Sequence, residues 1–213
     1  MTSSILKKYY LVFDTETTGL LPSNPHLVSI AYKVFVTETI AGETKIAMIH
    51  SAYFIAKVPL DVEIPDESAA IHKITTERSQ NYGIDISTII DRLHEVFQMW
   101  PISMIVAHNT KFDINVLVLE LKRLRNKTST LLLSHLQNID LFCTCMSGKQ
   151  VTKIERVRGR QVYYKLPKLV ELHEYYFGND TFTQHNAEGD TFACARCFFK
   201  MQYNKDINYE MSF

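Results

Sequence analysis

The sequence has no surplus of charge of either sign. Its 213 residues include 23 basic and 23 acidic side chains, so the formal net charge is zero. A protein that binds nucleic acid tightly and without regard to sequence is usually more basic. Composition alone therefore does not indicate a nucleic-acid-binding protein, and any such affinity has to come from local basic patches or from bound metal ions.

Cysteines and long apolar runs are also scarce. Four cysteines in 213 residues are too few to indicate a secreted disulfide scaffold. No apolar run reaches the roughly 18 residues that a membrane helix requires, and the apolar stretch at residues 9–13 is too short for the core of a signal peptide. We therefore expect an intracellular protein, cytoplasmic or nuclear, that is neither secreted nor bound to a membrane.

What is present suits a globular α/β domain. A hydrophobic fraction of 46% and an aromatic fraction of 11% allow a packed core, and we expect residues 1–213 to form a single domain. Apolar and β-branched runs predict strands at residues 9–13, 27–36, 46–55, 104–107 and 138–141, with a hairpin connection at 37–44. Helical patterns cover residues 67–72, 75–79, 86–100, 112–125, 167–177 and 186–203, with Pro167 expected in the opening turn of its helix. This order predicts a mixed β-sheet of about five strands flanked by helices.

The first candidate site is the pair Asp14 and Glu16, which follows the apolar stretch at residues 9–13. The spacing alone carries no weight, because about 2.5 acid-x-acid pairs are expected by chance and the chain has three. The position is more informative, since carboxylates at the carboxyl end of a central strand can point into one cleft. Two like charges there are costly unless a cation neutralises them.

Two further segments place acids near the starts of predicted helices. Asp113 ends the segment 107–113 after a short strand, and Asp190 lies about one turn into the last helix, after His185 in a polar loop. Each acid has an ordinary explanation when taken alone, because carboxylates stabilise the amino-terminal end of a helix dipole.

Taken together, the order and flanking residues of the three segments resemble the DEDDh (DnaQ-like) 3′→5′ exonucleases, which have a ribonuclease H-like fold. The resemblance covers roughly residues 9–200 and rests on the stretches 13–20, 107–113 and 185–190. His185 precedes Asp190 by five residues, as in the histidine branch, whereas the tyrosine branch would need tyrosine in place of Asn186. The chain departs from the family at Lys73, where many members have glycine, and in the length of the segment 149–168.

The resemblance implies a two-metal mechanism. Asp14, Glu16, Asp113 and Asp190 would bind two Mg²⁺ ions, for which Mn²⁺ would substitute, and His185 would take a proton from the attacking water. Products would be 5′-mononucleotides. The substrate-binding residues expected from the family motifs are Thr15, Thr17, Gly19, Leu20, His108, Asn109 and Phe112. For Leu20 and Phe112, core packing is an equal alternative to base contact, and for His108 we favour a role in ordering its loop.

Basic residues cluster in two places. Those at residues 122–127 are better explained by the end of a helix than by binding. The segment 149–168 contains seven basic residues against Glu155, and an arm that binds a nucleic-acid backbone is as well supported there as a merely solvated hairpin. The cysteines at 143, 145, 194 and 197 could in principle bind zinc, but we expect buried helix residues instead.

The expected substrate is single-stranded or 3′-terminal nucleic acid, with DNA slightly favoured over RNA. The alternatives are a 3′→5′ exoribonuclease and a non-catalytic nucleic-acid-binding or polymerase-associated module with the same fold. A polymerase or a second copy of the chain, in a homodimer, is an open choice of protein partner.

Overall fold

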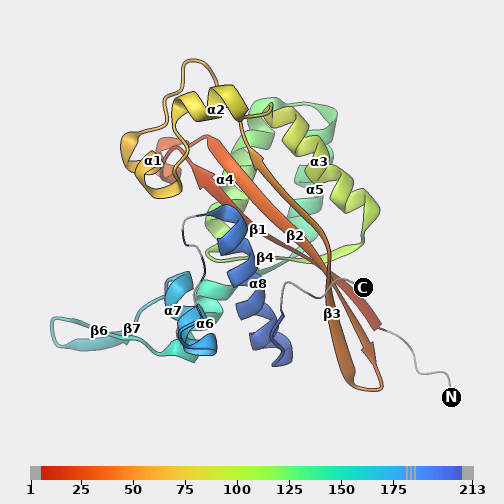
Figure 1. Cartoon of the computed structure of the whole chain (residues 1–213), viewed down its shortest axis with the longest axis vertical. Coiled ribbons are helices and arrows are strands. Elements are labelled where there is room, and N and C mark those ends of the chain that lie inside the picture. Colours follow the sequence, from red (N-terminus) through yellow and green to blue (C-terminus); the bar gives the residue numbers. More distant parts are fainter. Residues whose placement is uncertain (1–5, 181, 183, 185, 208–213) are drawn as a thin grey trace.

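The computed structural model describes residues 6–180, 182, 184 and 186–207, and Figure 1 shows how its elements are arranged. The strands are β1 (Leu6–Thr17), β2 (Leu27–Ile40), β3 (Glu43–Ile55), β4 (Ile102–Ala107), β5 (Asp140–Cys143), β6 (Glu155–Arg158) and β7 (Gln161–Tyr164). The helices are the short 3-10 helix η1 (Leu21–Ser23), α1 (Asp66–His72), α2 (Thr76–Tyr82), α3 (Ile86–Met99), α4 (Thr110–Leu124), α5 (Lys127–Asn138), α6 (Thr144–Thr152), α7 (Leu169–Phe177) and α8 (Ala187–Tyr203). Within the described residues, no helix combines the length and the apolar character that crossing a bilayer would require.

Five strands form the main sheet, in the order β3-β2-β1-β4-β5. β1 lies at its centre, antiparallel to β2 and parallel to β4. β2 and β3 form an antiparallel hairpin, and β5 runs parallel to β4 at the other edge. The predicted mixed sheet of about five strands with flanking helices is therefore confirmed.

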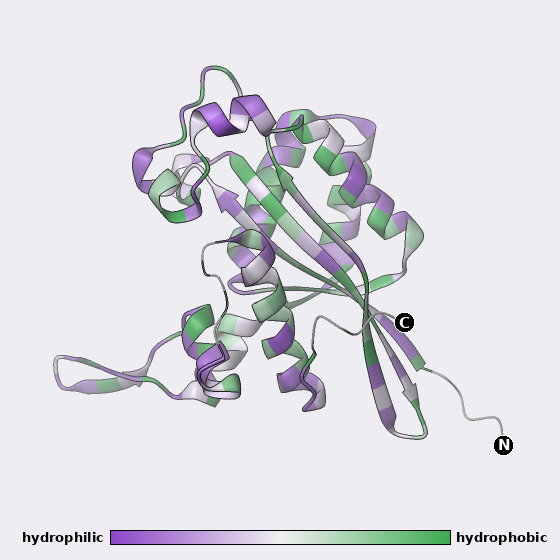
Figure 2. Cartoon of the chain, in the orientation of Figure 1, coloured by the Kyte–Doolittle hydropathy of each residue, from purple (hydrophilic) through white to green (hydrophobic). Residues whose placement is uncertain are grey.

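Helices cover both faces of this sheet (Figure 1). α3, α4 and α5 pack on one face, and α8 packs on the other. Successive side chains of a strand point to opposite faces, so Leu11 and Phe13 of β1 lie in the first core and Tyr10 and Val12 lie in the second. Figure 2 shows the matching pattern of hydrophobic residues along β1 and β2. A strand buried on both sides explains why the stretch at residues 9–13 is continuously apolar.

The connection between β2 and β3 is shorter than the hairpin predicted at residues 37–44. β2 extends to Ile40 and β3 begins at Glu43, which leaves only Ala41 and Gly42 between them. Their φ angles of 51° and 86° are both positive. Two such residues form the tight turn whose twist matches that of paired strands, so the strands continue almost to the tip.

Helix α5 lies where no helix was predicted. Its capping residue, Asn126, accepts a hydrogen bond from the Ser129 N–H through Oδ1 at 2.7 Å and donates its own N–H to Ser129 Oγ at 2.9 Å. This reciprocal pair differs from the usual Ser or Thr followed three residues later by Glu, so the sequence signals it only weakly. Because α5 continues to Asn138, the strand predicted from residue 138 begins only at Asp140.

Pro167 does not lie in the opening turn of a helix, as predicted. α7 begins at Leu169 after its capping residue Lys168, so Pro167 precedes both. Its carbonyl instead accepts hydrogen bonds from His108 Nε2 at 3.1 Å and from Cys145 Sγ at 3.4 Å. Pro167 therefore connects the chain before α7 to the loop after β4.

Lys73 closes α1 in the left-handed conformation, with φ of 63°. Glycine reaches this conformation without steric cost, whereas other residues are disfavoured there. The glycine that the family resemblance implies at this position would therefore suit the observed backbone conformation. The departure at Lys73 affects the end of a surface helix.

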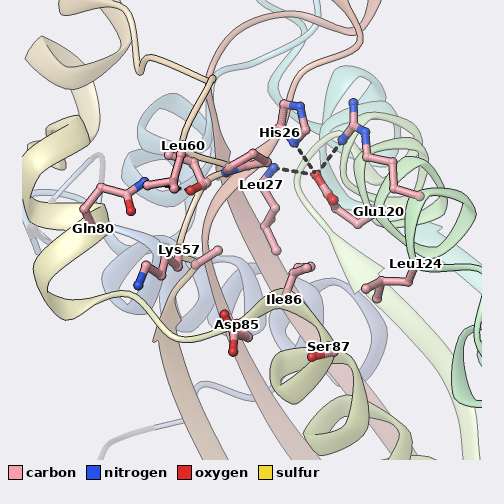
Figure 3. A pocket seen from close by; sticks show the side chains of 14 residues that line it. His26, Leu27, Lys57, Leu60, Gln80, Asp85, Ile86, Ser87, Glu120 and Leu124 are labelled. Carbon is pink, nitrogen blue, oxygen red and sulfur yellow. Dashed lines mark hydrogen bonds and ion pairs between the residues drawn. The ribbon is translucent and has the colours of Figure 1, made fainter.

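A hollow of about 440 Å³ opens between the start of β2, the loop after β3, and the helices α2, α3 and α4 (Figure 3). Beside it, the buried Glu120 carboxylate accepts hydrogen bonds from Leu27 N–H at 3.0 Å and from Arg123 Nη1 at 2.5 Å. Arg123 also donates to the carbonyls of Asn24 and Pro25. These bonds hold the entry into β2, so Arg123 has a structural role. None of the predicted site residues that the structure describes lines this hollow.

Candidate active site

The central strand presents two carboxylates on the face covered by α8. Alternate residues of a strand point to the same face, so Asp14 and Glu16 lie on the same face of β1 as Tyr10 and Val12. Tyr10 and Val12 belong to the core beneath α8. Val12 is fully buried, whereas Asp14 and Glu16 are half-buried. The end of β1 therefore carries both acids from the apolar core to its rim, where solvent and a ligand can reach them.

Helix α8 brings the third acid to the same place. The Asn186 side chain caps the helix by accepting a hydrogen bond from Glu188 N–H at 3.0 Å, and the Asp190 N–H donates to the Asn186 carbonyl at 2.9 Å. One carboxylate oxygen from each of Asp14, Glu16 and Asp190 lies within 4.8 Å of the others. Residues far apart in the sequence thus form one compact acidic cluster.

Asp113 lies beside this cluster and is held there by Thr15. Thr15 points to the opposite face from Asp14 and Glu16, toward α4. It donates to Asp113 Oδ1 from its N–H at 3.1 Å and from Oγ1 at 2.7 Å. Asp113 is only 2% exposed, and its charge raises the pKa of Asp14. The structure therefore brings all four predicted acids to the end of β1.

Burial and mutual repulsion disfavour the ionised forms of these acids. Burial, followed by the charge of Asp190, raises the pKa of Glu16 to about 7. Burial also raises the pKa of Asp113 to about 7, against the opposing hydrogen bonds from Thr15. The pKa of Asp14 is well above its ordinary value because of burial and the charges of the other three acids. A divalent cation would remove this repulsion, and carboxylate oxygens are ligands that suit Mg²⁺ or Mn²⁺.

His108 uses both of its ring nitrogens inside the protein. Nε2 donates to the Pro167 carbonyl at 3.1 Å, which leaves Nδ1 to accept from Thr144 Oγ1 at 2.9 Å. Burial lowers the pKa of His108 to about 4, so the ring is neutral near pH 7. These contacts agree with a role in ordering the loop. Thr144 and Pro167, its two partners, carry no motif that would have revealed them in the sequence.

Asn109 and Phe112 lie between His108 and Asp113. Asn109 is exposed at the start of α4, with φ of 79° and no capping hydrogen bond from its side chain. Phe112 is half-buried and packs partly against the core beneath α3, α4 and α5. Its ring therefore has both a packed part and an accessible part.

The turn after β1 is held by hydrogen bonds from Thr17 and Thr18. Thr17 Oγ1 donates to the Gly19 carbonyl at 2.6 Å, and Thr18 N–H donates to the His26 carbonyl at 3.0 Å. This turn leaves the side chain of Leu20 73% exposed. Core packing, one of the two alternatives for Leu20, is therefore ruled out.

His185 lies outside the described residues, so its role remains a prediction from the sequence. The cysteines differ in one respect from expectation: Cys145, Cys194 and Cys197 are buried helix residues, but Cys143 ends strand β5 and caps α6. Within the described part of the chain, only the acidic cluster brings three metal-binding side chains together. The cysteines therefore do not form a zinc site there.

Comparisons with known proteins agree with this arrangement. A family model described as Exonuclease (RNase_T) matches residues 11–198. No curated protein sequence matches the chain. Escherichia coli exonuclease I in complex with a dA16 oligonucleotide superposes with a TM-score of 0.64 at 15% identity, over 92% of this chain and 41% of that chain. The zinc-bound E. coli exonuclease I–ssDNA complex has a TM-score of 0.64 at 17% identity, and the match covers 94% of this chain and 42% of that chain. Exonuclease I from Methylocaldum szegediense has a TM-score of 0.60 at 17% identity, and the match covers 93% of this chain and 41% of that chain.

The chain spans about two fifths of the length of these exonuclease I structures. The likeness to them shows a shared ribonuclease H-like exonuclease fold, with its mixed five-strand sheet between helices. The family model covers most of the sequence, including the four acids that meet at the end of β1. The chain therefore belongs to the RNase T exonuclease family, the DnaQ-like DEDDh exonucleases.

Proposed function

We propose that this chain is a metal-dependent 3′→5′ exonuclease that hydrolyses phosphodiester bonds at nucleic-acid 3′ ends and releases 5′-mononucleotides. The observation that carries the proposal is the convergence of Asp14, Glu16 and Asp190 within 4.8 Å. Family membership supports hydrolysis as the activity. We further propose that residues 1–213 form one exonuclease domain, since the family match extends over residues 11–198.

The four acids would hold two divalent ions, Mg²⁺ by preference with Mn²⁺ as a substitute. The clustered oxygen donors and the raised pKa values of Asp14, Glu16 and Asp113 support a bound cation. When bound, such ions lower the pKa of water and neutralise charge on the phosphoryl group. The protein's contribution is to keep the carboxylates together at the rim of the core.

Other side chains would orient the reacting groups. Thr15 fixes one oxygen of Asp113 through two hydrogen bonds and leaves the other oxygen for a ligand. We propose that His185 accepts the proton of the attacking water, because an imidazole pKa near neutrality suits a general base. This assignment rests on the position of His185 five residues before Asp190 in the sequence.

The exposed turn after β1 would bind the terminal nucleotide. Leu20 is available to pack on a base, and Thr17 and Gly19 hold the turn that presents it. Phe112 offers part of its ring for stacking, which tolerates any base. The exposed amide of Asn109 would contact the same strand. The family motifs place Thr15 and His108 among the expected substrate-binding residues. Their hydrogen bonds within the protein favour a supporting role for both, which for His108 is the loop-ordering role favoured from the sequence.

We propose DNA as the preferred substrate, with RNA as the alternative. Two of the similar E. coli exonuclease I structures are complexes with a dA16 oligonucleotide and with single-stranded DNA, which supports this choice by analogy. Discrimination depends on contacts to the 2′-hydroxyl of the bound strand.

A gel time course on single strands labelled at the 3′ or the 5′ end tests the proposed activity. With Mg²⁺ or Mn²⁺, a 5′-labelled strand should shorten progressively, whereas a 3′-labelled strand should release labelled mononucleotide at once. Comparing the rates on a DNA strand and an RNA strand of the same sequence shows which sugar the enzyme prefers. Endonucleolytic fragments, or no cleavage by the folded protein with either metal, would contradict the proposal.

Replacing Thr15 by valine should weaken both metal binding and turnover. Valine keeps the branched shape but removes the hydroxyl that donates to Asp113 at 2.7 Å. Loss of such a supporting contact typically costs about ten- to a hundredfold in metal affinity or activity. The measurement is the Mn²⁺ concentration that gives half-maximal hydrolysis, together with the maximal rate.

Thr15→Ser is the matched control, since serine keeps the hydroxyl. It should restore most of the activity lost in Thr15→Val. If both variants require the same Mn²⁺ concentration as the unchanged protein, Thr15 does not position Asp113.

A further inference from the structure

Of the two basic clusters in this neutral chain, the segment 149–168 has the larger excess of positive charge. Residues 149–168 hold seven of the 23 basic residues and one of the 23 acidic residues, a formal charge of +6. The rest of the chain therefore carries a formal charge of −6. A polyanion would be repelled by most of the molecule and attracted to this segment.

The segment contains a hairpin, β6–β7, that projects away from the body next to α6 and α7 (Figure 1). All eight residues of its two strands are exposed. In an antiparallel pair, residues opposite one another share a face. Arg156 opposes Tyr163 and Arg158 opposes Gln161, which makes one face cationic and aromatic. We call these four residues the Arg–Tyr face.

The other face of the hairpin has a different character. Val157 opposes Val162, and Glu155 opposes Tyr164, so this face is largely apolar and carries the only acid of the segment. The two faces of the hairpin therefore differ in charge. The separation places two guanidinium groups and a phenol ring together, a combination that suits phosphates and bases.

The base of the hairpin is attached to the active-site scaffold. Lys165 N–H donates to the Ile154 carbonyl at 2.9 Å, and Lys165 Nζ forms an ion pair with Glu171 of α7. Two residues further on, the Pro167 carbonyl accepts the hydrogen bond from His108. His108 precedes α4, the helix that carries Asp113. The hairpin β6–β7 is therefore joined to the segment around Pro167, which contacts the loop at His108 that leads to Asp113.

We propose that the Arg–Tyr face binds the single-stranded nucleic-acid substrate upstream of the 3′ end that occupies the acidic cluster. Arg156 and Arg158 would pair with backbone phosphates, and Tyr163 would stack on a base. A strand whose 3′ end occupies the acidic cluster needs a cationic surface elsewhere on the protein, because the chain outside residues 149–168 is net acidic. This inference rests on the proposed exonuclease function and adds to it a surface for the strand that remains uncut.

The test measures the binding of a fluorescent single strand by fluorescence anisotropy. The strand has about 20 nucleotides, which is longer than most single-strand binding sites. EDTA is present so that the strand is not hydrolysed during the measurement. The variant Arg156→Gln/Arg158→Gln/Tyr163→Thr should bind about tenfold more weakly or worse. The slope of log affinity against log salt should fall by about 1.4, since each phosphate contact contributes about 0.7 on single strands. DNA and RNA strands of the same sequence are tested side by side.

Two variants serve as controls. Lys45→Gln/Lys122→Gln removes the same amount of charge from exposed positions outside the hairpin, and Val157→Thr/Val162→Thr alters its opposite face. Both should bind the strand as the unchanged protein does. The proposal would be overturned if the Arg–Tyr variant bound the strand as tightly as the unchanged protein, or if either control lost as much affinity as that variant. It would also be overturned if the unchanged protein did not bind the strand.

Hydrolysis of a small ester separates this inference from the proposed function. The p-nitrophenyl ester of thymidine 5′-monophosphate has no upstream nucleotides for the hairpin to bind, so its hydrolysis reports on the acidic cluster. With Mn²⁺, the Arg–Tyr variant should hydrolyse this ester at the unchanged rate while losing about tenfold in kcat/KM on the long strand. A protein that binds the strand through the hairpin but hydrolyses neither substrate would refute the exonuclease function and leave the binding surface standing.

Discussion

Replacing Asp14 by asparagine is expected to lower the rate of 3′-end hydrolysis by about a thousandfold or more, as removal of a central active-site group typically does. Asp14 lies in the middle of the acidic cluster, and the charges of Asp113, Glu16 and Asp190 all act on its carboxyl. Asparagine keeps the shape and one oxygen but removes the negative charge that a divalent ion requires. The measurement is the initial rate of mononucleotide release with saturating Mn²⁺.

The same substitution should leave the fold at least as stable as before. In EDTA, the midpoint of thermal unfolding of Asp14→Asn should equal or exceed that of the unchanged protein, because one of four mutually repelling acids has been neutralised. Asp61→Asn is the matched control, since Asp61 and Glu63 repeat the acid-x-acid spacing on an exposed loop. It should alter neither the rate nor the midpoint. An active Asp14→Asn protein would refute the assignment of the site.

A divalent cation is expected to raise the thermal stability of the unchanged protein. The acids of the cluster repel one another, and a ligand that binds only the folded state adds about 2.7 kcal/mol at a hundredfold excess over its Kd. For a chain of this size, that corresponds to a rise of about 5 to 10 °C in the unfolding midpoint. The measurement compares melting curves in EDTA and in Mn²⁺ or Mg²⁺ at a fixed pH.

The variants again separate specific from general effects of the cation. Asp14→Asn should lose most of the rise, whereas Asp61→Asn should show all of it. Identical midpoints with and without the cation in the unchanged protein would mean that the cluster does not bind these metals. The expected result would also distinguish a metal site from a set of acids that is protonated near neutral pH.

Local patterns in the sequence were sufficient for most of the fold. The apolar stretch at residues 9–13 predicted a buried central strand, and the helical periodicity of residues 86–100 predicted α3. The failures occurred where the signal was weak or depended on distant contacts. The α5 cap uses an unusual Asn126–Ser129 pair, and Pro167 is positioned by a hydrogen bond from His108, which lies 59 residues earlier in the chain.

For the site, the sequence alone determined which acids to consider and the family to which they belong, because the flanking residues of three short segments form a recognisable set. It also determined the concentration of basic charge in residues 149–168. Only the tertiary structure decided that Asp14, Glu16 and Asp190 meet within 4.8 Å. The tertiary structure also revealed the hydrogen bonds of Thr15 to Asp113, and those of His108 that agree with the loop-ordering role favoured from the sequence.

The physical reason is that a short segment specifies its own backbone but not its neighbours. Alternation along β1 assigns Asp14 and Thr15 to opposite faces, yet the packing of α4 and α8 on those faces determines which partners each side chain meets. The hairpin follows the same rule. Its basic composition is visible in the sequence, but strand pairing decides that Arg156 lies opposite Tyr163 and Arg158 opposite Gln161.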